Sequence, residues 1–199
     1  MEIREQTYGV NYGSGEVILT YPGVSSCMTL TYYYTPTEEY DVGLLAGLHV
    51  GLYNHDDSQV SRQDVGTMFI GLNALAPRGV RPSYAFLIGQ YELWRVANAD
   101  VLFCLRDEAQ RQCGRKLMDE EFSDASDHNV VTIKILTSGV VRIKPTAKKG
   151  QPDIDPEVWH FGNPLNSVVG IQGNTKSLRA RPDLFTGGVS IEEQRRMGH

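Results

Sequence analysis

The sequence has few cysteines, no long apolar run and no excess of basic residues. Its 199 residues include three cysteines, an odd number that does not suit the disulfide framework of a small secreted protein. No apolar run approaches the roughly 18 residues of a membrane-spanning helix, so we expect no membrane span. The net charge of −5 argues against nonspecific nucleic-acid binding, which requires a positive patch. The N-terminus lacks a basic segment followed by an apolar one, so we expect no Sec-type secretory signal.

The sequence also lacks the spacings that mark common metal and nucleotide sites. Neither Cys-x-x-Cys nor His-x-x-x-His occurs, whereas a structural zinc site needs about four Cys or His ligands at close spacing. No GxGxxG or GxxxxGK[ST] pattern follows a predicted strand. We therefore expect no metal and no other cofactor.

Strand and helix patterns predict a mixed α/β domain over residues 1–144. Residues 27–34 are rich in threonine and tyrosine, as buried strands are. Residues 42–53 are apolar almost throughout, and their glycines favour a strand over a helix. Further strands are expected at 16–21, 83–91, 130–136 and 140–144, and helices at 61–76 and 99–113. The fold class is therefore α/β, with β-sandwich-like mixed sheets and flanking helices.

Residues 145–199 differ in composition from the part that precedes them. They contain much proline, glycine, asparagine and arginine and few periodic apolar stretches. We interpret this segment as a loop-rich C-terminal extension packed on the same domain, with a short helix beginning at Ser190.

The three cysteines fall into two groups by context. Cys104 and Cys113 follow the apolar pattern of a predicted helix, which favours a structural role. Cys27 begins a strand directly after a turn, so its thiol is expected near a sheet end, where a substrate can reach it. Backbone N–H groups of that turn, at Ser25 and Ser26, could stabilise an oxyanion.

A nucleophilic cysteine needs an imidazole partner, because an unperturbed thiol is mostly protonated at neutral pH. Of the five histidines, only His49 lies inside an apolar strand. An antiparallel pairing centred near residue 38 places His49 opposite Cys27, with Cβ atoms about 5 Å apart. The alternative is a structural histidine whose ring is satisfied by a backbone carbonyl.

Three segments around these residues resemble a known family. GVSSCMTL (23–30) resembles the strand that carries the nucleophilic cysteine in the chemotaxis glutamine deamidase family, CheD, and LAGLHVGL (45–52) resembles its histidine strand. The pattern of 131–143 resembles the family's terminal hairpin. The cytotoxic necrotizing factor catalytic domain shares the fold of that family and its pair of catalytic residues, a cysteine and a histidine. Its Leu-Ser-Gly-Cys motif corresponds to residues 24–27 here. The resemblance covers roughly residues 3–144.

The resemblance implies a protein glutamine deamidase that acts through a Cys27 thioester, with His49 as general base and acid. It assigns Ser25 and Ser26 to the oxyanion region and Thr20 to orienting the imidazole. The family's Gly-Gly-Ala segment is Ile88-Gly89-Gln90 here, and residues 145–199 have no counterpart. These differences favour a divergent member of this family, such as a bacterial effector or toxin.

The expected partner is a protein that presents a target glutamine, chosen by loops that include 35–41 and 54–60. The expected location is the bacterial cytoplasm, or a host cell reached by Sec-independent secretion. Two alternatives remain open: another Cys–His acyl-transfer enzyme, such as a transglutaminase or peptidase, and a non-catalytic protein-binding module on the same fold. The sequence carries no signal for an oligomeric state.

Overall fold

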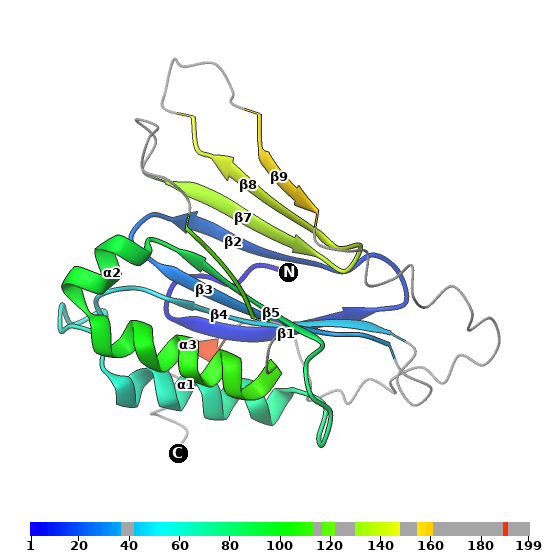
Figure 1. The fold of residues 1–199 in the computed structure, drawn as a ribbon, viewed down its shortest axis with the longest axis horizontal. Coiled ribbons are helices and arrows are strands. Elements are labelled where there is room, and N and C mark those ends of the chain that lie inside the picture. Colours follow the sequence, from blue (N-terminus) through cyan, green and yellow to red (C-terminus); the bar gives the residue numbers. More distant parts are fainter. Residues whose placement is uncertain (37–41, 114–116, 122–129, 148–154, 161–188, 191–199) are drawn as a thin grey trace.

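The structure is a computed structural model that describes residues 1–36, 42–113, 117–121, 130–147, 155–160 and 189–190. The described elements form three layers: a four-stranded sheet, a six-stranded sheet and a layer of helices (Figure 1). The predicted α/β class is therefore confirmed at the level of two packed sheets with flanking helices.

The six-stranded sheet has the order β10-β1-β4-β3-β5-β6. Every pairing in it is antiparallel except that of β5 with β6. Its central strands β3 and β4 are buried at every position, because the sheet is covered on both faces. Its members are β1 (Thr7–Gly13), β3 (Met28–Tyr34), β4 (Gly43–Val50), β5 (Tyr84–Gly89), β6 (Leu117–Glu121) and β10 (Val189–Ser190).

The four-stranded sheet has the order β2-β7-β8-β9 and is antiparallel throughout. Its members are β2 (Ile18–Val24), β7 (Val131–Leu136), β8 (Val140–Pro145) and β9 (Glu157–His160). The predicted hairpin is confirmed as β7–β8, and Gly139 in its turn has a φ of 84°, a conformation that glycine adopts without steric cost.

The described part of the C-terminal extension contains two short strands. It supplies β9 to the smaller sheet and β10 to the larger one. Both strands are short, with four and two residues, so neither is long enough to show an alternating apolar pattern. The helix predicted to follow Ser190 lies outside the described residues.

The three helices are α1 (Arg62–Leu75), α2 (Tyr91–Ala97) and α3 (Ala99–Cys113). They cover the face of the six-stranded sheet that lies away from the smaller sheet (Figure 1). Helix α1 begins with a capping box in which the Ser61 hydroxyl accepts from Asp64 N–H and the Asp64 carboxylate accepts from Ser61 N–H. Helix α2 was not predicted; the strand expected to reach Tyr91 ends at Gly89, and the fully buried Trp94 anchors a short helix.

Side chains of β3 and β4 alternate between two hydrophobic cores. Leu30 and Leu48 face the helices, whereas Tyr33 and Leu45 face the four-stranded sheet. Because side chains alternate with a period of two along a strand, the odd-numbered positions of both strands share the space between the sheets. Cys27 belongs to this inter-sheet core, and His49 lies on the same face of β4.

The two sheets approach closely at Gly47. Tyr21 projects from β2 onto the larger sheet, where its hydroxyl donates to the Leu30 carbonyl (3.0 Å) and pairs with the Thr31 hydroxyl. A Cβ on Gly47 would lie 2.0 Å from the Tyr21 Oη and 2.5 Å from a Leu19 methyl carbon. The contact therefore requires a residue without a side chain at position 47.

Replacing Gly47 with alanine should lower the free energy of unfolding by about 1–3 kcal/mol, because the added methyl group overpacks the inter-sheet core. Urea denaturation measures this loss. Gly66→Ala in α1 is the matched control, since its added methyl meets nothing within 4 Å; helix propensity should stabilise it by up to about 1 kcal/mol. A Gly47→Ala protein as stable as wild type would contradict the close approach.

Candidate active site

Cys27 and His49 lie on the same face of the six-stranded sheet, but they are not directly opposite each other. The β3–β4 register pairs Thr29 with His49 and Met28 with Val50, so the predicted pairing of Cys27 with His49 is wrong by two residues. The pairing of the two strands is centred one residue later along the chain than the prediction assumed. Because the slip is an even number, both side chains keep a common face. Cys27 is thus a diagonal neighbour of His49, and the resting structure has no hydrogen bond between the Cys27 sulfur and the His49 Nε2.

The His49 ring is fully buried, and one of its nitrogens is held by the N-terminal segment. Its Nδ1 lies 3.1 Å from the Ile3 carbonyl oxygen. A carbonyl can only accept, so Nδ1 carries the proton and Nε2 bears a lone pair. Nε2 is buried without a hydrogen-bond partner among the described residues. The ring therefore presents a free basic nitrogen while its other nitrogen is fixed.

Burial also determines the charge state of His49. It lowers the pKa of the imidazole to about 4, and the Ile3 carbonyl opposes this shift only in part. The ring of Tyr21 packs edge-on against it, with centroids 5.9 Å apart. His49 is therefore neutral near pH 7 and constrained on two sides.

Thr20 does not orient the imidazole as the resemblance implied. Its neighbours Leu19 and Tyr21 point into the inter-sheet core, so its side chain projects from the opposite face of β2. Its backbone acts instead: the Thr20 carbonyl accepts from Ile3 N–H (2.8 Å), and Thr20 N–H donates to the Met1 carbonyl (2.9 Å). Thr20 thus positions Ile3, whose carbonyl positions His49.

The Cys27 thiol is buried, with an exposed fraction of 1%. The Ser25 backbone N–H and the Ser26 hydroxyl both hydrogen-bond to its sulfur, and each of these contacts lowers its pKa. The indole N–H of Trp94 donates to the Ser26 carbonyl (2.6 Å) and fixes this turn. Both serines of the predicted oxyanion region therefore lie at the sulfur.

Glu5 is the residue at this site that the sequence did not indicate. Its carboxylate hydrogen-bonds to the Cys27 sulfur, and its charge opposes thiolate formation. Burial, with Glu5 as the next contributor, raises the pKa of Cys27 to about 12. Glu5 lies in a segment without regular structure that no motif marks. The resting site thus contains a neutral thiol and a neutral imidazole.

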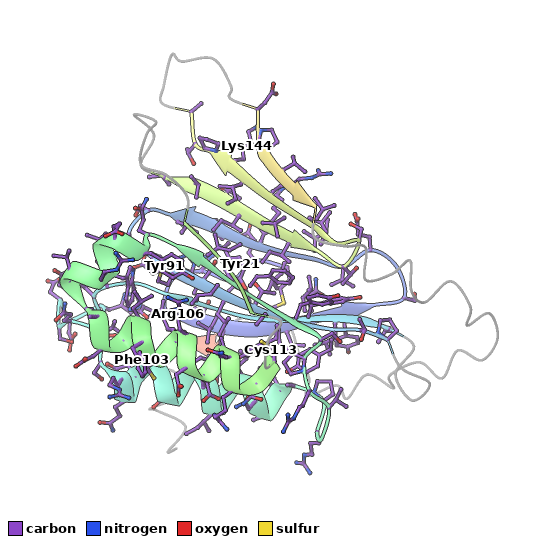
Figure 2. The ribbon with its side chains drawn as sticks, viewed as in Figure 1. Tyr21, Tyr91, Phe103, Arg106, Cys113 and Lys144 are labelled. Atoms are coloured by element: carbon purple, nitrogen blue, oxygen red, sulfur yellow. The ribbon has the colours of Figure 1, made fainter. Side chains whose placement is uncertain are left out.

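The other two cysteines lie apart from this site. Cys104 and Cys113 are half-buried and pack on the helix side of the larger sheet, and the Cys113 thiol donates to the Ala109 carbonyl. Figure 2 shows Tyr21 between the sheets and Cys113 at the end of α3.

Among the described residues, no group of three metal-ligating side chains occurs, and no helix is long and apolar enough to cross a membrane.

Comparison with known proteins does not assign the chain to a family. No protein-family model matches it, and no curated protein matches it significantly. The chemistry of the site is therefore inferred from its own residues: a thiol, an imidazole with a free nitrogen, and donors at the sulfur.

The buried imidazole predicts a specific dependence of stability on pH. The pKa of His49 is about 4 in the folded state against 6.5 for an exposed histidine, so the unfolded chain binds more protons between these values. Stability should therefore fall as the pH falls from about 6.5 to about 4, by about 3 kcal/mol from this residue.

Urea denaturation at several pH values checks this, with His49→Gln expected to lose that part of the acid sensitivity. His55→Gln removes an exposed histidine of a loop and should keep the wild-type dependence. Parallel stability profiles for wild type and His49→Gln would show that His49 is not buried in its neutral form.

Proposed function

We propose that the protein is a cysteine-dependent amidohydrolase that converts a glutamine side chain of a protein substrate to glutamate. The observation that carries the proposal is the free Nε2 of His49. Leaving a buried polar atom unpaired costs about 1–3 kcal/mol, and of the four such side-chain atoms among the described residues this nitrogen is the only base. Cys27, on the same face of the sheet, supplies a nucleophile that such a base could serve.

The reaction follows from these groups. As the Cys27 sulfur attacks the carboxamide carbon, His49 Nε2 takes the thiol proton. The Ser25 N–H and Ser26 hydroxyl stabilise the oxyanion. His49 then gives the proton to the leaving nitrogen, the C–N bond breaks, and ammonia departs. Water, deprotonated by His49, attacks the thioester; the C–S bond breaks, and the proton returns to Cys27.

The charge states favour proton transfer during the attack over a preformed ion pair. With pKa values of about 12 for Cys27 and about 4 for His49, the thiolate–imidazolium state is strongly disfavoured at rest. A bound carboxamide changes this balance, because the negative charge moves from sulfur to an oxygen that faces hydrogen-bond donors.

The resemblance to CheD and to the cytotoxic necrotizing factor catalytic domain supports glutamine as the target. We propose a protein substrate on the same ground, with action in the bacterial cytoplasm or, for an effector, in a host cell. A transglutaminase or peptidase would use the same residues. It would differ in the amide that is cleaved or in the nucleophile that reacts with the thioester.

A second candidate function is a protein-binding module without catalysis. The observation that favours it is the burial of the Cys27 thiol together with its raised pKa, since active thiols usually have lowered pKa values. The two candidate functions make different predictions for Cys27: the deamidase requires its sulfur, and the binding module does not.

Cys27→Ala should abolish deamidation, whereas Cys104→Ser, which alters a thiol on the other side of the sheet, should retain it. The assay incubates each protein with a short glutaminyl peptide and with a bacterial and a eukaryotic cell extract. It measures ammonia release and the conversion of glutamine to glutamate by mass spectrometry. Conversion by Cys27→Ala at the wild-type rate would exclude the thioester mechanism, and no conversion by wild type or by the Glu5→Ala variant described below would favour the binding module.

A further inference from the structure

The Glu5 side chain fills a space beside Cys27 that the strand sequence leaves open. Continuing the β3–β4 register by one pair places Cys27 opposite Gly51. A Cβ on Gly51 would lie 2.0 Å from a Glu5 carboxylate oxygen, so the carboxylate occupies the volume of the missing side chain. The same carboxylate hydrogen-bonds to the Cys27 sulfur.

Glu5 is held there by the residues on either side of it in the N-terminal segment. Ile3 is fully buried and bonds to Thr20 and His49. Gln6 is buried with a φ of 56°, and its side-chain amide donates to the Tyr53 carbonyl (2.7 Å). A non-glycine residue in the left-handed region persists only where its surroundings fix it. Glu5 itself is exposed, so it links the buried thiol to the surface.

We propose that Glu5 is an internal product mimic: its side chain occupies the subsite of the substrate glutamine and must leave before an external glutamine can react. This inference rests on the proposed deamidase function. Glutamate is the product of that reaction, and its side chain has the length and shape of glutamine. A carboxylate bears a negative charge and resists nucleophilic attack, so Glu5 occupies the subsite without reacting.

If the proposal is correct, the glutamine of the Glu5→Gln variant is a substrate of the variant's own active site. The Cys27 sulfur would attack the Gln side chain at position 5, the C–N bond would break, and ammonia would leave with a proton supplied by His49. Water would then cleave the thioester and leave glutamate at position 5. The variant would thus regenerate the wild-type sequence.

Mass spectrometry of the N-terminal peptide follows this conversion during incubation of purified Glu5→Gln. We expect position 5 to change from glutamine to glutamate, or a species that has lost ammonia to accumulate as the internal thioester. The double variant Glu5→Gln with Cys27→Ala should remain unchanged. Glu2→Gln, an exposed glutamate three residues earlier in the same segment, should also retain its glutamine.

A second variant tests whether the Glu5 side chain occupies the glutamine subsite, and this test does not require the protein to react with its own side chain. Glu5→Ala should open the subsite and remove a charge that opposes the thiolate, so iodoacetamide should alkylate Cys27 about tenfold faster, as a pKa lower by one unit would give. Its deamidation of an external glutaminyl peptide should rise in parallel. Glu2→Gln should match wild type in both assays, and urea denaturation confirms that each variant is folded.

A glutamine that persists at position 5, or Glu5→Ala rates equal to those of wild type, would overturn the product-mimic proposal. If wild type still deamidates the external peptide through Cys27, the proposed function survives that result. If neither the wild-type nor the variant proteins convert any glutamine, the deamidase function fails as well.

Discussion

The close approach of the two sheets at Gly47 is the constraint on which the site depends. Tyr21 can reach the backbone and hydroxyl of β3 only because position 47 carries no side chain. This contact fixes β2, and the backbone of Thr20 in β2 holds Ile3. The Ile3 carbonyl in turn fixes the His49 ring, against which Tyr21 packs edge-on. One packing contact therefore determines the tautomer and orientation of the candidate base.

Burial has opposite consequences for the resting state and for the reaction. It keeps both Cys27 and His49 neutral, because an isolated charge in a low-dielectric core is costly. The same low dielectric strengthens the hydrogen bonds that Ser25 and Ser26 offer to a developing negative charge. A substrate that brings its carbonyl to these donors therefore changes the energetics of proton transfer more than it would at an exposed site.

The sequence predicted the parts of this structure that side-chain patterns encode. Threonines and tyrosines predicted the strand that is β3, and the helix predicted over residues 61–76 is α1. The face shared by Cys27 and His49 followed from the period of two, even though the register was wrong. The roles of Ile3 and Glu5 had no signal, because a backbone carbonyl is common to all residues and Glu5 reaches Cys27 only through tertiary folding. The strands β9 and β10 were too short to show a pattern.

The two candidate functions weigh the same buried groups differently. A binding module accounts for the raised pKa of Cys27, but not for a buried His49 nitrogen without a partner or for donors directed at the sulfur. A deamidase accounts for these donors and for the free nitrogen, and it must explain the protected thiol. The product-mimic proposal supplies that explanation, because the Glu5 carboxylate is one cause of the raised pKa of Cys27 and its side chain is exposed. On this proposal the protected thiol belongs to an occupied site, and the unpaired nitrogen of His49 is the observation on which the proposed function rests.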